Sequence, residues 1–352
     1  MSYRISQIIE SFLVYSFGVF ASLIVLVIIL LVLGYSPLMS LSALLHGGFG
    51  TAYNISQSLN QSAIFLLCAL AFILPAKSRF YNIGAEGQMY LGALIAFLVG
   101  SQLGNFHPAV AITLTALAGF AGGMLWIAVP VLMKVKLQIN EIFTTMIFNF
   151  IAINLVNWLT AGPLKDPYSY HLQTPPLPPS TWLPVIVSST ELNAGISLSL
   201  VLALATYILL EKTIIGLEIK ATGFNPRAAR ALGVKTTFNM LIAALIGAGF
   251  AGLAGMIVVT TGSHILTQNF SPGYGYLGIA IAALSNFNPL GAMIASFFYA
   301  ALWVGGMHLQ FLPGKAAIPV QLIYVFENLI VIIVLVVKAL SEERRRILSW
   351  LA

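Results

Sequence analysis

The stretch SFLVYSFGVFASLIVLVIILLVLG, residues 11–34, carries no charged residue and is almost wholly apolar. About 20 apolar residues in a helix are enough to cross the hydrocarbon core of a bilayer. The run is too long for the core of a signal peptide and lacks a convincing small-residue cleavage site, so we expect it to remain as a spanning helix. Because the period-two alternation of an outer-membrane barrel is missing, the chain is predicted to be an all-α, polytopic integral membrane protein.

The composition of the whole chain points the same way. Of its 352 residues, 59% are hydrophobic and 7% are charged, and the mean hydropathy is +0.96. Soluble domains carry roughly 25% charged residues, so an ordinary water-soluble fold is excluded. The single cysteine, Cys68, lies inside an apolar run and cannot form an intramolecular disulfide.

Apolar windows recur along the chain and predict about ten transmembrane helices in one domain, residues 1–352. The windows are 11–34, 60–76, 86–102, 109–133, 138–161, 194–210, 239–261, 275–286, 289–306 and 319–338. Two of them, 60–76 and 275–286, are short, and the second, with a dozen residues, would cover only about 18 Å as a helix. We expect broken or re-entrant helices at these two places, which makes them candidates for a translocation path.

The distribution of positive charge predicts the orientation. With both termini in the cytoplasm and the windows alternating, all but two of the 16 Lys and Arg residues fall on the cytoplasmic side. The exceptions are Lys165 and Lys315. The net charge of +6 is therefore explained by membrane topology, with lipid around the spans and no need for a nucleic-acid partner.

Two further segments suggest structural roles. The external segment 162–193 contains GPLKDPYSYHLQTPPLPPSTWLP, whose prolines favour irregular backbone, and we expect it to fold over the outer mouth as a passive lid or as a binding surface. GFAGGM at 119–124 echoes GFAGLAGM at 249–256. Small-residue clusters of this kind permit close helix packing, whether they arose by internal duplication or independently.

Motifs for chemistry are absent from the sequence. No G-x-x-x-x-G-K-[ST] loop occurs, and LPGKAA at 312–317 lacks both the upstream glycine and the hydroxyl residue, so the chain is not expected to hydrolyse ATP. H-E-x-x-H, C-x-x-C and G-x-S-x-G are also missing. The histidines are scattered at His46, His107, His171, His264 and His308. We therefore predict no enzyme activity, no metal site and no cofactor.

Acidic residues in or near the spans are candidates for function, because carboxylates at membrane depth are costly. Glu86 and Glu141 lie near the starts of their predicted helices, where the helix dipole stabilises them, and Glu327 lies nearer mid-span. Polar residues in 138–161 recur at helical spacing along one stripe. They are Glu141, Thr145, Asn149 and Asn157. Such a stripe either lines an aqueous path or joins helices by hydrogen bonds.

The cytoplasmic segment 212–238 is polar and ordered in composition. Gly223, Asn225 and Pro226 predict a turn into a short helix, with Asn225 as its cap and Pro226 as its first residue. The helix is expected to stop at Gly233. With Arg227 and Arg230 three residues apart and no large apolar face in AARALG, it suits docking into a cleft of another protein better than lying on the membrane surface.

Seven motifs in order resemble one transporter family. They are YNIGAEGQMYLGA (81–93), NEIFTTMIFNFIA (140–152), GPLKDP (162–167), TPPLPPS (174–180), GLEIKATGFNPRAARALGV (216–234), FSPGYGYLGIAIAAL (270–284) and NPLGAMIASFFYAALWVGG (288–306). The chain resembles ABC importer permeases of the branched-chain amino acid and ribose permease superfamily, most closely the nucleoside-type permeases that work with basic membrane lipoproteins. The resemblance covers almost everything after the first window.

The resemblance implies an importer of the cell membrane with several partners. These are a second permease subunit, commonly a different chain of which this one looks like the longer, ABC ATPase subunits that bind ATP and magnesium, and an extracellular lipoprotein that binds the solute. Segment 216–234 matches the part that contacts the ATPase. The residues of this expected contact are Gly216, Glu218, Lys220, Ala221, Gly223, Asn225, Ala228, Ala229 and Gly233, with Arg227 and Arg230 added by the docking interpretation.

The expected substrate path rests on the polar groups at membrane depth and not on the resemblance. Its residues are Asn82, Glu86, Gln88, Glu141, Thr145, Asn149 and Tyr274. The resemblance alone implies purine or other nucleosides as the solutes, with sugars, riboflavin or amino acids as alternatives. An ion-coupled secondary transporter that uses Glu327 or the Glu141 stripe is the rival class, and a membrane-embedded enzyme is disfavoured by the missing catalytic motifs.

Overall fold

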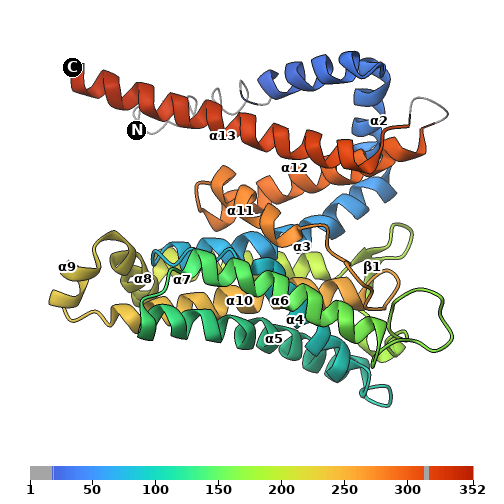
Figure 1. Cartoon of the computed structure of the whole chain (residues 1–352), viewed down its shortest axis with the longest axis horizontal. Coiled ribbons are helices and arrows are strands. Elements are labelled where there is room, and N and C mark those ends of the chain that lie inside the picture. Colours follow the sequence, from blue (N-terminus) through green and yellow to red (C-terminus); the bar gives the residue numbers. More distant parts are fainter. Residues whose placement is uncertain (1–17, 19, 313–316, 352) are drawn as a thin grey trace. The chain divides into compact units, whose positions relative to one another are not determined.

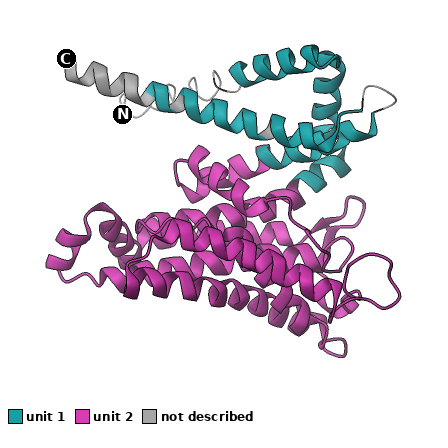
Figure 2. Cartoon of the chain, in the orientation of Figure 1, with its two compact units in different colours: residues 1–58, 299–352 teal, residues 59–298 magenta. Residues whose placement is uncertain are grey.

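A computed structural model describes residues 18, 20–312 and 317–351, with the side chains of Glu327, Lys338 and 342–351 outside the description. The described residues are mostly helical, which confirms the predicted all-α class (Figure 1). It divides into two compact units, residues 1–58 with 299–352 and residues 59–298 (Figure 2). We refer to them as unit 1 and unit 2.

Unit 2 contains most of the helices. They are most of α3 (Ala52–Ala76), α4 (Ala85–Gly100), α5 (Pro108–Leu137), α6 (Glu141–Ala161), α7 (Gly195–Lys212), α8 (Ile214–Phe224), α9 (Pro226–Ala231), α10 (Thr236–Thr260), α11 (Tyr274–Leu284) and the first half of α12 (Pro289–His308). A short 3₁₀ helix, η1 (Pro179–Thr181), and a hairpin of β1 (Val185–Val187) and β2 (Leu192–Asn193) complete it.

Unit 1 contains the helix over Phe20–Val32, α2 (Pro37–Phe49), the second half of α12, η2 (Leu309–Phe311) and α13 (Val320–Leu351). Its buried core is formed by Leu26, Leu30, Leu309, Ile318, Ile323 and Phe326. The rings of Trp303 and Tyr324 stack at 5.2 Å between α12 and α13. The side chain of Glu327 lies outside the described residues, so its predicted role stays a prediction.

Within the described residues, seven helices are long and apolar enough to cross a membrane. They are α3, α5, α6, α7, α10, Pro289–Phe311 and Val320–Ser341. Three shorter apolar helices, Phe20–Val32, α4 and α11, coincide with further predicted windows. The count of about ten spans and the cytoplasmic termini stay predictions, and the beginning of window 11–34 and Lys315 lie outside the described residues.

The prediction of a short helix at 60–76 is wrong. These residues are the second part of α3, a continuous helix of 25 residues. Its polar first part was missed because hydropathy falls there, yet the hydroxyl of Ser56 donates to the carbonyl of Tyr53 in its own helix at 2.7 Å. The short helix at 275–286 is confirmed as α11, with 11 residues, and α4 is a second short helix with 16.

Helices α4, α5 and α10 meet at glycines and form the centre of unit 2. A Cβ atom on Gly252 of α10 would overlap the carbonyl oxygen of Gly119 in α5, and one on Gly92 of α4 would overlap the backbone of Gly252. Gly123 approaches the carbonyl of Ala248 as closely. The two small-residue clusters therefore allow close helix packing, as predicted, and the structure shows that they pack against each other. Helix α4 is buried along nearly its whole length.

The segment 162–193, which is predicted to be external, is irregular apart from η1 and the hairpin, and this confirms the expectation from its prolines. It runs beside the irregular chain at 261–273 that precedes α11. The backbone N–H groups of Thr174 and Leu177 donate to the carbonyls of Leu266 and His264 at 3.0 and 2.8 Å. Its role as lid or binding surface stays open.

Candidate functional site

The 212–238 segment folds into two helices, α8 and α9, joined at Asn225. The Oδ1 atom of Asn225 accepts hydrogen bonds from the backbone N–H groups of Arg227 and Ala228, each at 3.1 Å. Pro226 is the first residue of α9, and Gly233 follows its end with a φ of 84°. The predicted capped helix is therefore confirmed, and helix α8 before it was not predicted.

The prediction that Gly223 forms part of the turn is wrong. Gly223 lies inside α8, where its lack of a side chain allows contact with the backbone carbonyl of Lys77 in the α3–α4 connection. Gly216 serves the same purpose at the other end of α8, against the carbonyl of Leu209 in α7. Both glycines are required for close approach of two backbones rather than for a turn.

Polar contacts fix α8 further. The amide of Asn239 in α10 donates to Oε2 of Glu218 at 3.0 Å, and Lys220 pairs with Glu211 at 3.0 Å. Burial lowers the pKa of Lys77, a shift opposed by Glu211 and reinforced by the positive charge of Lys220. Helix α8 is thereby attached to α7, to α10 and to the α3–α4 connection.

Helix α9 is exposed by contrast. Arg227 and Arg230 are exposed, and the apolar side chains of Phe224 and Leu232, which flank the helix, are both 84% exposed. Ala229 is the buried residue of the helix. We call Phe224, Arg227, Arg230 and Leu232 the α9 surface. It combines two large apolar groups with two guanidinium groups, a combination typical of protein interfaces.

A buried amide pair lies at the start of α4. Asn82 and Gln88 exchange two hydrogen bonds, from Nδ2 to Oε1 at 2.9 Å and from Nε2 to Oδ1 at 2.8 Å. Asn82 also donates to the carbonyl of Ala71 in α3 at 3.3 Å, and its Oδ1 accepts from Gly84 N–H at 3.0 Å. These bonds place the beginning of α4 beside the last part of α3.

Asn149 of α6 connects three segments. Its Oδ1 accepts from Gly87 N–H at 2.8 Å, and its Nδ2 donates to the carbonyl of Ile83 at 2.9 Å and to the hydroxyl of Tyr276 at 3.0 Å. Thr145, one turn earlier, accepts from Ile83 N–H at 3.2 Å. The α6 stripe therefore joins helices by hydrogen bonds, one of the two predicted roles.

Glu86 lies between the first turns of two helices. It is 1% exposed, and its Oε2 accepts from the backbone N–H of Gly275 at 2.7 Å. Gly275 is in the first turn of α11, and a Cβ there would overlap the backbone of Glu86. The carboxyl group thus occupies the amino-terminal ends of α4 and α11, where helix dipoles favour it.

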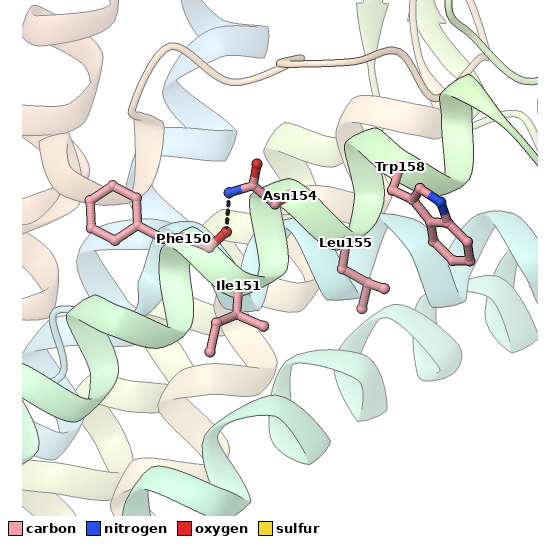
Figure 3. Close-up of a pocket in the computed structure, with 5 residues that line it drawn as sticks. All are labelled: Phe150, Ile151, Asn154, Leu155 and Trp158. Atoms are coloured by element: carbon pink, nitrogen blue, oxygen red, sulfur yellow. Dashed lines mark hydrogen bonds between the residues drawn. The ribbon is translucent and has the colours of Figure 1, made fainter.

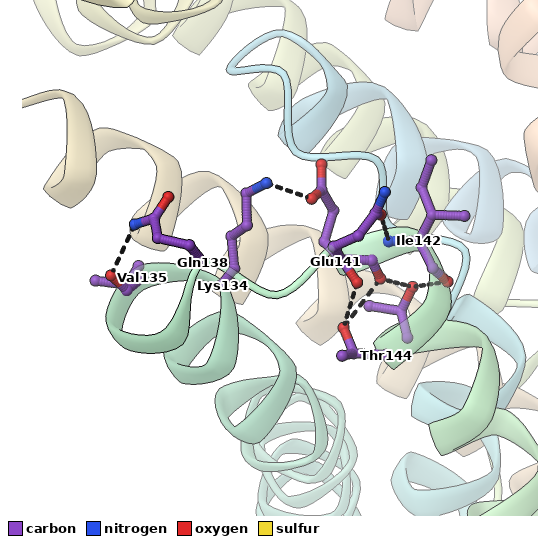
Figure 4. A network of polar contacts seen from close by, with 8 residues as sticks. Lys134, Val135, Gln138, Glu141, Ile142 and Thr144 are labelled. Carbon is purple, nitrogen blue, oxygen red and sulfur yellow. Dashed lines mark hydrogen bonds and ion pairs between the residues drawn. The ribbon is translucent and has the colours of Figure 1, made fainter.

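Two predicted path residues lie apart from this network. Glu141 forms an ion pair with Lys134 at 2.8 Å and so joins the end of α5 to the start of α6 (Figure 4). Its backbone carbonyl accepts from the Thr145 hydroxyl at 2.7 Å, but its side chain does not reach the amides. Tyr274 packs against Phe65 of α3, with the ring centroids 5.5 Å apart.

Several residues of the polar network were not predicted from the sequence. Tyr276, 37% exposed, carries the hydroxyl that Asn149 bonds, and Tyr90 contacts the backbone of Ser271 at 3.4 Å. Asn157 was assigned to the stripe, but its partner Asn269 was not foreseen, although the two amides meet at 2.8 Å. The tyrosines in SPGYGYLG, whose hydroxyls can form hydrogen bonds, were the feature of the sequence that could have indicated this part of the network. No cluster of metal-ligating residues occurs within the part of the chain that the structure describes.

A family model described as branched-chain amino acid transport system / permease component matches residues 54–336. The chain belongs to this family. The permease is therefore a multi-pass protein of the cell membrane, and the resemblance inferred from its motifs is confirmed.

Curated relatives of the permease are subunits of ABC transporters. The chain is 28% identical to the glucose ABC transporter permease protein TsgB13 of Haloferax volcanii, over 89% of this chain and 84% of the relative. It is 28% identical to the guanosine ABC transporter permease protein NupP of Bacillus subtilis (87% and 88%) and 24% identical to the nucleoside ABC transporter permease protein NupB of Lactococcus lactis (79% and 79%). No solved structure matches the permease.

One surface groove of the permease lies on α6 (Figure 3). It is lined by Phe150, Ile151, Asn154, Leu155 and Trp158. The amide of Asn154 donates to the carbonyl of Phe150 at 2.8 Å, within the same helix. Because the lining is mostly apolar and comes from one helix, it is typical of a surface that meets lipid or another membrane helix.

Proposed function

We propose that this permease is one membrane subunit of an ATP-driven importer and that the α9 surface docks into the ATPase subunit. The observation that carries the proposal is the contrast between the two helices. Helix α8 is attached to the spans at three places, whereas α9 exposes Phe224, Leu232 and two arginines. Because α8 holds the α9 surface on the membrane helices, a movement of a partner bound to α9 can be transmitted to these helices.

The route of transmission runs from α8 to the polar network. Gly223 contacts the carbonyl of Lys77, and Lys77 begins the connection that carries Asn82 and Ile83. These two residues are bonded to α3 and to α6. In the proposed mechanism, ATPase closure moves α8, the connection shifts, and the exposed edge near Tyr276 opens a path beside the network.

The proposal includes the other components expected from the family resemblance. ATP and magnesium are bound and used by the ATPase. A second, non-identical permease subunit completes the path, and an extracellular lipoprotein delivers the solute. The residues proposed to lie along the path are Asn82, Glu86, Gln88, Glu141, Thr145, Asn149 and Tyr274.

We propose nucleosides as the solutes, because two of the relatives above are named for guanosine and nucleoside transport. The relative named for glucose supports a sugar as the second candidate. Proteoliposomes that contain the complete importer and its binding protein would separate the two by uptake of guanosine against glucose. Uptake driven by a proton gradient with the permease alone would contradict the ATP-driven mechanism.

The docking proposal is tested by charge reversal. Arg227→Glu with Arg230→Glu is expected to leave membrane insertion intact and to abolish co-purification with the ATPase, because both arginines are exposed and the Nε–H group of Arg230 donates to a carbonyl of α9 itself. Lys136→Glu, an exposed basic residue at the end of α5, is the matched control. Unchanged recovery of the ATPase with the double variant would refute the proposal.

A further inference from the structure

A buried amide in α3 lacks a partner. The Nε2 atom of Gln61 is enclosed and has no hydrogen-bond partner among the residues that the structure describes. The amides of Asn82, Gln88 and Asn149 are bonded, as described above. Because buried polar groups are almost always satisfied, an enclosed amide donor without a partner requires an explanation, and a ligand that binds there is one.

The position of Gln61 places this donor near the start of α11. Gln61 lies four residues before Phe65, so the two share one face of α3. The ring of Phe65 meets that of Tyr274, the first residue of α11, edge-on at 5.5 Å. Further along, Gly278 of α11 packs on the backbone of Cys68. Helix α11 therefore follows α3 and begins one turn beyond Gln61.

The start of α11 lies deep in the membrane region. Phe65 is near the middle of α3, a helix long enough to cross the bilayer, and Tyr274 contacts it there. The 11 residues of α11 cover only about 16 Å, so the irregular chain that leads directly into Tyr274 supplies the rest of the crossing. Interrupted spans of this kind form solute sites in transporters, because irregular backbone at that depth lines a cavity.

The residues around the start of α11 limit the charge that the solute can carry. Residues 59–76, 80–133 and 236–298 contain no lysine or arginine, so α11 and the adjoining parts of α3, α4 and α10 offer no cation. The N–H of Gly275 in the first turn of α11 is already occupied by the carboxyl group of Glu86 at 2.7 Å. An anionic group would have no partner here, and unpaired charge at membrane depth is costly.

We propose that Gln61 and Tyr274 contact the solute at the centre of the translocation path and that the solute is neutral. Gln61 donates from Nε2 to an acceptor on the solute, and the ring of Tyr274, held by Phe65, packs against a ring of the solute. Nucleosides and sugars meet these conditions, and amino acids do not. The inference rests on the proposed importer function and specifies its site.

The test measures transport rates for related solutes with the complete importer and saturating binding protein. Guanosine is compared with 7-deazaguanosine, 2′-deoxyguanosine and inosine. The wild type is expected to carry at least one analogue about three- to tenfold more slowly than guanosine, the effect of one lost hydrogen bond. In the variants Gln61→Leu and Gln61→Met, guanosine is expected to be transported as slowly as this analogue is by the wild type. The transport rate of the analogue itself is expected to stay the same in both variants. Gln102→Leu, an exposed glutamine at the end of α4, is expected to change nothing.

If Gln61 had a purely structural role, its variants would slow the transport of all solutes by the same factor, and that outcome would overturn the proposal. A wild type that transports guanosine and every analogue at the same rate would overturn it as well. If the wild type carries glucose and no nucleoside, the nucleoside substrate is refuted, and glucose against 2-deoxyglucose tests Gln61 in the same way. Transport of leucine or glutamate in place of guanosine or glucose would refute the proposal that the solute is neutral.

Discussion

Gly223 of α8 packs directly against the backbone carbonyl of Lys77, so α8 and the connection that leads into α4 touch without an intervening side chain. A backbone contact of this kind has little freedom to adapt, because neither partner can rotate away. It explains why a glycine stands inside a helix, where it costs roughly 1 kcal/mol relative to alanine.

Gly223→Ala is expected to separate α8 from the α3–α4 connection, because its methyl group would overlap the Lys77 carbonyl oxygen. The cost of such overpacking is about 1 to 3 kcal/mol. We expect ATPase co-purification to persist while uptake per ATP hydrolysed falls. Gly104→Ala, whose methyl group would meet Pro178 at an ordinary 3.5 Å, should have no effect on either measurement.

Phe224→Ala with Leu232→Ala is expected to weaken ATPase binding without changing stability, because both side chains are 84% exposed. Loss of two exposed apolar anchors should reduce affinity at least about tenfold, in the range of interface hot spots. Titration of the purified permease with its ATPase measures the effect. Tyr170→Ala on the external segment is the control, and wild-type affinity in the double variant would mean that α9 docks through its arginines alone.

Gly252→Ala is expected to destabilise the centre of unit 2, because the added methyl group would overlap the carbonyl oxygen of Gly119 at the α5–α10 crossing. The expected loss is about 1 to 3 kcal/mol, with a lower thermal unfolding midpoint. Thermal unfolding in detergent measures it. A midpoint equal to that of the wild type would show that the three helices can move apart without cost.

The sequence predicted parts of this structure well and others poorly, for physical reasons. Asn225, Pro226 and Gly233 define the α9 boundaries because capping and left-handed backbone are local properties. Gly223 was misassigned because its role depends on Lys77, which is distant in the sequence. The beginning of α3 was missed because hydropathy does not register that a serine such as Ser56 satisfies its hydroxyl within its own helix.

The candidate site divides in the same way. Asn149 was placed on the correct stripe by helical spacing, but its partners Ile83, Gly87 and Tyr276 come from other segments and no spacing rule identifies them. Gln61 was overlooked because one glutamine in a polar stretch has no distinctive pattern. Only its enclosure without a partner in the described structure sets it apart.

Asn149→Leu is expected to destabilise the permease by about 1 to 3 kcal/mol, because it leaves Gly87 N–H and the Ile83 carbonyl without their partner in the interior. Asn154→Leu provides a matched control on the same helix. The Asn154 amide is exposed and bonds only its own helix at Phe150, so its loss should change stability by less than about 0.5 kcal/mol. Equal unfolding midpoints for the two variants would contradict the proposed bridging role of Asn149.

The stability of segment 162–193 and of the chain at 261–273 beside it is expected to depend on pH through His264. The imidazole stacks on Trp182 with ring centroids 3.9 Å apart, and burial lowers the pKa of His264, an effect partly opposed by the carbonyl of Thr260. Because the folded chain holds the proton more weakly than the unfolded chain, its contribution is complete above the unfolded pKa of about 6.5 and is lost as the pH falls through the lower folded value. Thermal unfolding between pH 7.5 and 5 should show this loss in the wild type and a smaller one in His264→Gln. His171→Gln, at an exposed position of the same region, should keep the wild-type profile, whereas identical profiles for His264→Gln and the wild type would rule out the imidazole as the titrating group.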